Sequence, residues 1–357
     1  MTTTAQDVDP ALAGMVAEFF TDLVAPEVVT RAEAAGLLPE LWAATEELGF
    51  PLVGVPEEQG GSGGSVRDLL VVLEAAGRSA APLPLPETAL AAWLLATAGA
   101  DVPSGPLAAV VSPGDGLTLR DGRLSGVVRD VPWARAAVRL VVLIDERGSP
   151  QVATVEAADF RIEPGADLAG QPRDVVRFED AEAEVRPWPL PVGGVLARAA
   201  LLRAAQMAGA VQQVSRITRE YVAQRVQFGQ AVGRFQSVQV HVATLAQAAV
   251  LSSLVVDRAG LAAVAGNGTF DAAAAKLVVD QQAGLAVRAA HQAHGAIGMT
   301  QEYRLQHFTR RLNAWRSDSG DEQSLALGIG AAVLRAGSIA RTITAPGGTK
   351  ESTWQTT

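Results

Sequence analysis

A guanidinium, an aromatic ring and an amide follow one another in one short stretch of the C-terminal half of the chain. The stretch reads RVQFGQAVGRFQSVQ and begins at Arg225. A guanidinium fork suits phosphate oxygens, an aromatic face can lie beside them, and an amide can meet a polar edge. Arg225, Phe228 and Gln236 could therefore hold an anionic group. The same residues would also suit a helix–helix turn in which two glycines relieve backbone strain and the arginines are solvated.

Long helices are expected on both sides of this stretch. Apolar residues recur at helical spacing before it, after it and again further along the chain. The lengths of these segments suit an antiparallel helical bundle. The sequence predicts four such helices: Leu196–Val222, Gln236–Gly260, Asp271–Gln292 and Ser324–Ser338.

The chain from about Pro10 to Ala100 is also helical in pattern, with helices expected at Val66–Ala76 and Thr88–Ala98. The run EEQGGSGGS, from Glu57 to Ser65, precedes the first of these two helices. It resembles a phosphate cradle in composition, but no strand comes before it as a dinucleotide fingerprint requires. We therefore expect a fixed turn there.

Between the two helical parts, β-branched runs and alternating apolar residues replace the helical period. Turn signals separate these runs, for example at Asp121-Gly122. The pattern predicts a small antiparallel β domain that is closed or nearly so. The expected strands are Leu107–Val111, Leu117–Leu119, Leu124–Val128, Val138–Ile144 and Val152–Val155, to which Asp174–Phe178 and Glu182–Val185 could be added.

Composition narrows the function classes. The 357 residues are 48% hydrophobic, which is enough for two or three domains with substantial cores. A formal net charge of -9 argues against a nucleic-acid surface, and the absence of cysteine excludes disulfides and thiolate chemistry. We expect no metal site, because His291 and His294 lack an evident third ligand. The alanine-rich helices are interrupted by polar residues, so we expect no membrane insertion and a cytoplasmic location.

Three runs of the sequence resemble the acyl-CoA dehydrogenase family. The first is the Arg225 stretch, the second is QAHGAIGMTQEYRL from Gln292 to Leu305, and the third is ELGFPLVGVPEEQGGSGGSVRDLLVVLEAAGRS, which ends at Ser79. The resemblance implies an α+β multidomain fold: a helical N-terminal domain, a β-barrel-like middle domain and a C-terminal four-helix bundle. We assign these domains to residues 1–104, 105–192 and 193–345, with a polar, mobile tail at 346–357.

Members of this family use FAD to convert an acyl-CoA thioester into its 2-enoyl form. A carboxylate removes the α proton while the flavin accepts a hydride from the β carbon, and an electron-transferring flavoprotein reoxidises the flavin. One half of each FAD site comes from a neighbouring subunit. The resemblance assigns that half to Arg225, Gln227, Phe228, Gln236, Gln292 and Gly295.

The chain departs from the family in two places. The flavin-cradling T-E-P-x-x-G-S-like loop is absent where the sequence reads AAVVSPGDGLTL, and Trp133 is followed by Ala134 and Arg135 rather than by a W-I-T-like strand. The expected position of the base falls on Ser319. The other position that the family uses falls on Ala199 or Ala200, which also lack a carboxylate.

These departures favour a non-catalytic subunit of a heteromeric (α2β2) acyl-CoA dehydrogenase, the type used for steroid or other bulky acyl-CoA substrates. The partner subunit would supply the base and the flavin cradle. A homomeric enzyme in which Asp321 or Glu322 is a displaced base is the first alternative, although both residues could instead form an acidic helix cap. A flavin-free structural subunit is the second.

Overall fold

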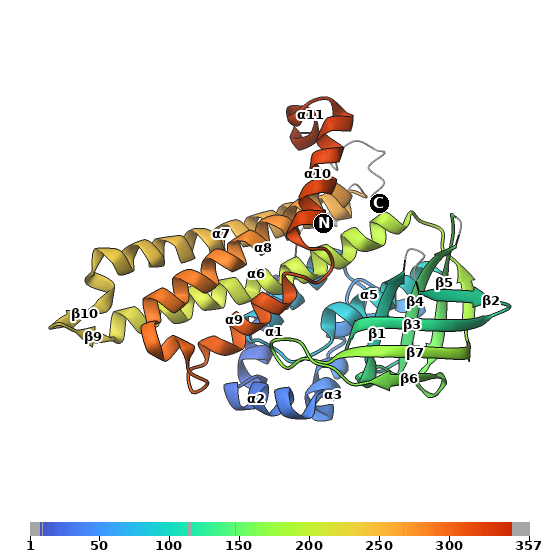
Figure 1. Cartoon of the computed structure of the whole chain (residues 1–357), viewed down its shortest axis with the longest axis horizontal. Coiled ribbons are helices and arrows are strands. Elements are labelled where there is room, and N and C mark those ends of the chain that lie inside the picture. The colour runs from blue at the N-terminus through green and yellow to red at the C-terminus, as the bar shows by residue number, and fades with distance from the viewer. Residues whose placement is uncertain (1–7, 9, 113–115, 147, 267, 345–357) are drawn as a thin grey trace. The chain divides into compact units, whose positions relative to one another are not determined.

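The structure, a computed structural model, describes the whole chain apart from residues 1–7, 9, 113–115, 147, 267 and 345–357. Helices come first, two small sheets follow, and long helices complete the chain (Figure 1). This is the predicted order of helical, β and helical parts. The tail at 346–357, which we predicted to be mobile, lies outside the described residues.

The N-terminal part consists of short helices. Three of them begin at a proline, a residue suited to the first helical turn because its missing N–H has no partner there in any case. The loop at Glu57–Ser65 is ordered by backbone hydrogen bonds, including Gly54 N to Gly63 O at 2.7 Å, so the expected fixed turn is present. The helices are α1 (Pro10–Leu23), α2 (Pro26–Ala35), α3 (Pro39–Glu47), α4 (Val66–Arg78) and α5 (Leu85–Thr97), with short 3-10 turns at Phe50–Leu52 and Glu57–Gln59.

The middle part forms two four-stranded sheets instead of a nearly closed barrel. Their strand orders are β1-β4-β5-β8 and β2-β3-β7-β6. The expectation of purely antiparallel pairing was wrong at one place, since β1 and β4 run parallel with Leu107 opposite Arg139. The strands are β1 (Leu107–Ser112), β2 (Leu117–Arg120), β3 (Arg123–Pro132), β4 (Arg139–Glu146), β5 (Ser149–Glu156), β6 (Phe160–Glu163), β7 (Arg173–Glu182) and β8 (Glu184–Pro187).

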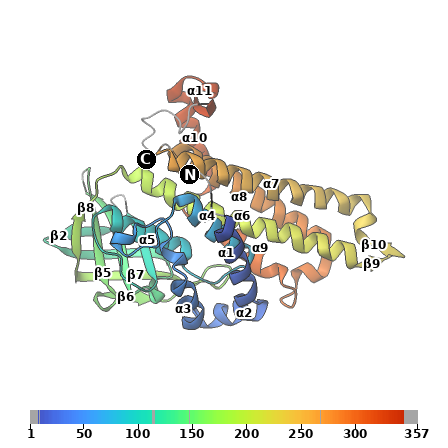
Figure 2. The ribbon, with the colours of Figure 1, turned by 180° about the vertical axis from the view of Figure 1, so that it is seen from behind.

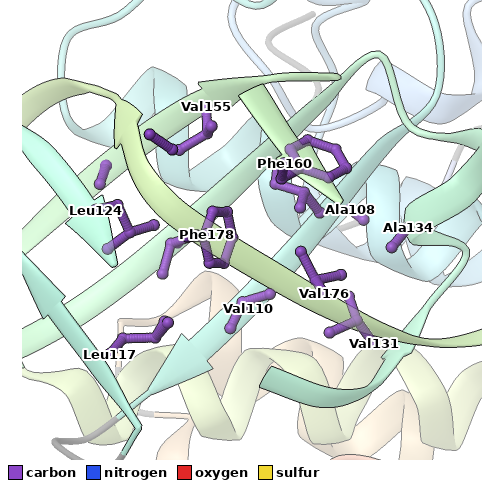
Figure 3. Close-up of a cluster of buried hydrophobic side chains, with 14 of the residues drawn as sticks. Ala108, Val110, Leu117, Leu124, Val131, Ala134, Val155, Phe160, Val176 and Phe178 are labelled. Atoms are coloured by element: carbon purple, nitrogen blue, oxygen red, sulfur yellow. The ribbon is translucent and has the colours of Figure 1, made fainter. Parts of the chain in front are cut away.

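One apolar core lies between the two sheets. Figure 3 shows side chains from both of them, including Val110, Val155 and Phe178, gathered in the same space. Phe160 and Phe178 meet edge to face at 6.1 Å between ring centroids, a favourable geometry for aromatic pairs. The alternation that predicted these strands is therefore the alternation of core-facing and outward-facing residues.

The C-terminal part is a set of long helices joined at one end by a small hairpin. The helices are α6 (Val192–Gln224), α7 (Gln236–Val264), α8 (Thr269–His294), α9 (Leu305–Trp315), α10 (Glu322–Ala336) and α11 (Ile339–Thr344), and the hairpin strands are β9 (Val226–Gln227) and β10 (Gln230–Ala231). All four predicted helices are present, and α9 and α11 are additional.

The chain forms two compact units. The first combines residues up to Val29 with Leu70–Ala81 and the chain from Ala200 onward, and the second combines Thr30–Leu69 with Pro82–Ala199. Each unit therefore mixes segments that are distant in sequence. The three boundaries drawn from the sequence between the domains and the tail stay predictions.

Within the first unit, α4 and α6 approach each other until their backbones touch. A Cβ atom added to Gly77 would lie 1.9 Å from the Gln206 carbonyl oxygen, and one added to Gly209 would lie 2.0 Å from the Glu74 carbonyl oxygen. Because both obstacles are backbone atoms of helices, no side chain can move aside to make room. This crossing requires glycine on both helices.

We expect Gly77→Ala and Gly209→Ala each to lower the free energy of unfolding by about 1–3 kcal/mol, the usual cost of overpacking. The matched control is Gly330→Ala in α10, where nothing lies within 4 Å of the added Cβ. There the better helix propensity of alanine should stabilise the protein by roughly 0.5–1 kcal/mol. Urea unfolding measures all three variants, and equal stabilisation by all of them would contradict the contact.

Candidate functional site

The β9–β10 hairpin connects α6 to α7 and lies beyond the ends of both helices (Figures 1 and 2). Gln227 pairs with Gln230 and Val226 with Ala231, which leaves Phe228 and Gly229 as the two turn residues. Both have positive φ, +54° and +80° respectively. Two-residue hairpin turns with positive φ at both positions fit the natural twist of paired strands.

Phe228 is an unfavourable residue for this backbone position. A non-glycine residue in the left-handed region costs about 1–2 kcal/mol, and asparagine or aspartate is the usual choice. The side chain gains little burial in return, since Phe228 is 92% exposed and stands edge-on to Phe235 at 6.1 Å. The hairpin therefore presents an aromatic ring outward at a cost to its own stability.

Five of the six predicted cofactor residues meet at one open pocket of about 500 Å³, which we call the hairpin pocket. Its wall contains Tyr221, Arg225, Gln227, Phe228, Val232, Phe235, Ser237, Val238, Gln292, Ala293, His294 and Gly295. Gln236 lies outside the wall, although its neighbours on both sides belong to it. Segments about seventy residues apart in sequence thus converge at one place.

The hairpin pocket is suited to an anion. It contains the Arg225 guanidinium and the first turn of α7, where Ser237 and Val238 line the wall. Phe235 is the N-cap of α7 and provides no side-chain hydrogen bond to the helix end. Unsatisfied N–H groups and the helix dipole make such an end attractive to phosphate oxygens. The sequence signal for this feature is the missing Ser, Thr, Asp or Asn before Gln236.

His294 also lines the hairpin pocket, although from the sequence we considered it only as part of an incomplete set of metal ligands. The residue is 4% exposed, its ring stacks on Tyr221 at 4.4 Å, and its Nδ1 lies 2.8 Å from the Ala290 carbonyl oxygen. That carbonyl requires a proton on Nδ1, and burial lowers the pKa of His294, so the neutral tautomer is favoured. Its Nε2, which has no partner among the described residues, then offers a lone pair to a donor.

Gly295 ends α8 in a backbone conformation, φ +64° and ψ -143°, that is open essentially to glycine alone. This turn leaves Gln292 exposed on the last turn of the helix, at the wall of the hairpin pocket. The residues fit a ligand with an anionic centre, an aromatic or apolar part and a hydrogen-bond donor. FAD has all three: a pyrophosphate, an adenine and hydroxyl or amino donors.

The acidic residues near Ser319 form a helix cap and an ion pair. Asp321 is the N-cap of α10 and accepts hydrogen bonds from the N–H groups of Gln323 at 2.9 Å and Ser324 at 3.0 Å. The Ser324 N–H is the largest of the hydrogen-bonding effects that lower the pKa of Asp321. Glu322 forms an ion pair with Arg316. Asp321 therefore serves as the helix cap that we considered, and Glu322 is bound to a guanidinium.

A buried ion pair holds the loop before α10. Lys276 Nζ lies 2.7 Å from both carboxylate oxygens of Asp280, and it lies 3.4 Å from the carbonyl oxygens of Arg316 and Gly320 at the two ends of the loop. Burial lowers the pKa of Lys276 and raises the pKa of Asp280 to about 7, and each effect is opposed by the other charge. The Lys276 ammonium group therefore holds both ends of the loop that contains Ser319.

A second ion pair in the same region joins the loop to α6. Asp318 lies 3.4 Å from Arg203 Nε, and both side chains are more than nine-tenths buried. The Arg203 guanidinium also lies over the Trp315 ring at 5.4 Å. Trp315 is 1% exposed, as expected of a core residue. This loop is fixed by packing and charge at several points.

The β domain has a turn directly after Trp133, at one of the two places where the sequence departs from the expected flavin-cradle pattern. Trp133 is buried, and the three residues after it form a 3-10 turn, Ala134–Ala136, instead of continuing a strand. Arg135 donates through its backbone N–H and through Nε to Asp174, each at 2.9 Å. Part of the other candidate stretch, residues 113–115, lies outside the described residues.

The described residues were compared with the requirements of a metal site and of a membrane-spanning helix. Within the described part of the chain, no group of three or more His, Cys, Asp or Glu residues is arranged to hold a metal. By length and composition, α7 is apolar enough to cross a membrane, which our expectation of interrupted apolar runs had overlooked. Only 17% of its most apolar stretch is buried within the chain.

Comparisons with known proteins agree on one family. The model of the acyl-CoA dehydrogenase N-terminal domain matches residues 7–102, and that of the C-terminal domain matches residues 188–334. Acyl-CoA dehydrogenase IpdE2 of Mycobacterium tuberculosis is 31% identical over 307 residues, which cover 83% of this chain and 89% of that protein.

Solved structures share the fold at lower identity. A variant of the Tcur3481-Tcur3483 steroid ACAD is 24% identical with a TM-score of 0.85, covering 92% of this chain and 98% of that chain. The ChsE4-ChsE5 complex from Mycobacterium tuberculosis is 20% identical with a TM-score of 0.81, covering 94% and 98% respectively.

We expect Lys276→Met to lower the free energy of unfolding by about 3–5 kcal/mol, because it leaves the Asp280 carboxylate buried without its partner. The double variant Lys276→Met/Asp280→Leu should recover most of that loss, since it removes both charges. Arg335→Met, at an exposed position on α10, is the control for loss of a cation. Urea unfolding of the single and double variants tests the pair, and an unchanged single variant would contradict its structural role.

Proposed function

As the chain belongs to the acyl-CoA dehydrogenase family, we propose that it is the non-catalytic subunit of a heteromeric member of that family. In this proposal it completes an FAD site whose flavin cradle and catalytic base are supplied by a partner subunit. FAD, when bound, supplies the hydride acceptor for the α,β-desaturation of an acyl-CoA thioester.

The observation that carries the proposal is the hairpin pocket. It brings Arg225, Gln227, Phe228, Gln292 and Gly295 together on a hairpin that extends beyond the helices it joins (Figure 1). A pocket that served only this chain would gain from burial of its aromatic wall, whereas Phe228 is 92% exposed. The exposed ring is better explained by a ligand shared with another subunit.

Each part of the hairpin pocket has a role toward FAD. Arg225 and the N-terminus of α7 would bind the pyrophosphate, which carries the negative charge. Phe228 would lie against an apolar or aromatic part of the cofactor. His294, as the neutral tautomer with a free lone pair on Nε2, would accept a hydrogen bond from a hydroxyl or amino group rather than contact a phosphate.

The absence of a base supports the non-catalytic role. By the family resemblance, the carboxylate would fall at Ser319 or, in the other arrangement, at Ala199 or Ala200, and none of these residues is acidic. The nearest acidic alternatives are bound elsewhere, Asp321 to the end of α10 and Glu322 to Arg316. A base must be free to take a proton from the substrate, so neither residue is well placed for that work.

The exposed face of α7 supports the presence of a partner. Val240, Val250 and Leu254 are 59%, 69% and 61% exposed, on the helix that also passes the length and hydropathy test for a membrane span. A large exposed apolar face on a helix calls for a covering surface. We propose another subunit of the enzyme as that surface, in keeping with a protein that lies outside the membrane in the cytoplasm.

The relatives support the wider setting. Tcur3481-Tcur3483 is described as a steroid ACAD, and ChsE4-ChsE5 is described as a complex of two components. We propose a steroid-derived or other bulky acyl-CoA as the substrate of the assembly. An electron-transferring flavoprotein is the proposed electron acceptor.

The first test is co-expression with a second family member that retains both the base and the flavin cradle. Alone, the chain should be free of flavin or aggregated, and the complex should contain about one FAD per two chains. Arg225→Ala should weaken FAD retention by roughly tenfold or more, because a charge-assisted hydrogen bond to the pyrophosphate is lost. Flavin absorbance and quantitative release measure both results.

Controls separate this proposal from the two alternatives. Asp321→Asn and Glu322→Gln should leave flavin reduction by acyl-CoA unchanged in the complex, whereas loss of reduction would indicate a displaced base in this chain. Unchanged FAD content in Arg225→Ala would indicate a structural subunit that takes no part in flavin binding. A yellow, active homomer of this chain alone would refute the non-catalytic role.

A second test uses the strain at the hairpin. Phe228→Asn places a residue suited to positive φ in the turn, so the stability of the chain should be unchanged or should rise by up to about 1 kcal/mol. FAD retention by the complex should fall, because the aromatic surface is gone. Equal FAD content in Phe228→Asn and the parent protein would mean that the ring is not part of the cofactor site.

A further inference from the structure

A second and larger cavity lies in the first compact unit, on another side of α6. Its volume is about 750 Å³, a size typical of small-molecule sites. Its walls come from α1, the turn between α1 and α2, the first half of α2, the end of α4, the second half of α6 and the start of α9. Four of its residues are Arg78, Arg216, Arg219 and Arg304, and we call it the arginine cavity.

The arginine cavity is positively charged in an acidic protein. The chain has a formal net charge of -9, yet the described residues that form the wall of the cavity include four arginines and no Asp or Glu. Glu220 is shared between Arg216 at 2.8 Å and Arg304 at 3.0 Å. Glu74 is the other carboxylate that interacts with these arginines, through Arg78, and its burial raises its pKa. Four guanidinium groups against two carboxylates leave a surplus of two positive charges.

Two of the arginines are available to a ligand in different ways. Arg219 has no carboxylate within ion-pairing distance among the described residues. Arg78 donates to a neutral acceptor, Gln212 Oε1 at 3.0 Å. A guanidinium that lacks a full counter-charge binds a carboxylate or phosphate in a fork-like geometry.

The remaining wall of the arginine cavity has an apolar part beside polar side chains such as Thr21 and Gln213. Val24 comes from the turn between α1 and α2, Val29 from α2, and Phe308 from α9. All three are at least nine-tenths buried, so they form a firm surface. We call the four arginines the charged rim of the cavity. Together with the apolar part of the wall, the charged rim suits a molecule that has an apolar body and an anionic end.

The arginine cavity is separate from the hairpin pocket and from the expected position of the base. Arg219 and Tyr221 are two residues apart on α6, and side chains at that spacing do not share a face. The other base position implied by the resemblance, Ala199 or Ala200, precedes Gln212 by at least twelve residues, or roughly 18 Å along the helix. A ligand in this cavity would contact neither site directly.

We propose that the arginine cavity binds an organic anion, a molecule with an apolar body and a terminal carboxylate or phosphate. Arg219 and Arg78 hold the anionic end, and Val24, Val29 and Phe308 contact the apolar body. The α4–α6 crossing keeps Arg78 beside Gln212 and so fixes the geometry of the charged rim. The proposal concerns this chain alone and does not depend on FAD binding or on a partner.

The test is calorimetric titration of the full chain, in the assembly in which it is soluble, with octanoate and octyl phosphate. Octanol is the neutral control, and inorganic phosphate is the anionic end without a body. Both amphipathic anions should bind, octanol should not, and inorganic phosphate should bind at least roughly tenfold more weakly than octyl phosphate. Tighter binding of octanoate than of octyl phosphate identifies a carboxylate ligand, and the reverse order identifies a phosphate ligand.

Variants locate the binding. Arg219→Gln and Arg78→Gln should each weaken it by roughly tenfold or more, Arg219→Lys should weaken it less, and Arg335→Gln on α10 should leave it unchanged. Arg219 is exposed, so its variants should keep the fold, and circular dichroism verifies this. Equal binding of octanol and octanoate, or unchanged anion binding in both glutamine variants, would overturn the proposal.

Discussion

The backbone contact between α4 and α6 is the constraint on which the first compact unit depends. Gly77 and Gly209 let the two helices approach until each glycine faces a carbonyl oxygen of the other helix. Interfaces this close leave no room for adjustment by rotamer changes, so α6 is held in one position along this part of its length. The charged rim beside the contact and the hairpin at the end of α6 both take their places from it.

A buried ion pair holds another part of the first compact unit, the loop before α10. Lys276 and Asp280 neutralise each other inside the helices, and Lys276 also reaches the two carbonyls at the ends of the loop before α10. A buried pair adds little net stability compared with apolar packing, but it enforces one arrangement because breaking it is costly. The loop before α10 is therefore a rigid connector in this chain.

The sequence predicted what depends on local pattern. Helical spacing located the long helices, and alternation located seven of the eight strands of the two sheets, because burial on one face imposes both periods. It missed β6, which is only four residues long, and the parallel pairing of β1 with β4, which joins segments separated by two other strands. No local signal encodes such a pairing.

The site was predictable only in part for a related reason. Arg225 and Gln292 could be assigned to one site through the family resemblance, since their convergence is set by the packing of three helices. His294 could not, because its tautomer and its burial follow from the Ala290 carbonyl and the Tyr221 ring. The four arginines of the second cavity come from three separate helices or their flanks, and in the sequence they look like ordinary solvated residues.

The exposed position of Phe228 affects the newly made chain. A newly made molecule displays this ring and the apolar side of α7 to the cell, and such surfaces attract chaperones and proteases. The time between synthesis and the covering of this surface then determines how many copies survive. The exposure of this surface alone therefore favours rapid covering of it after synthesis.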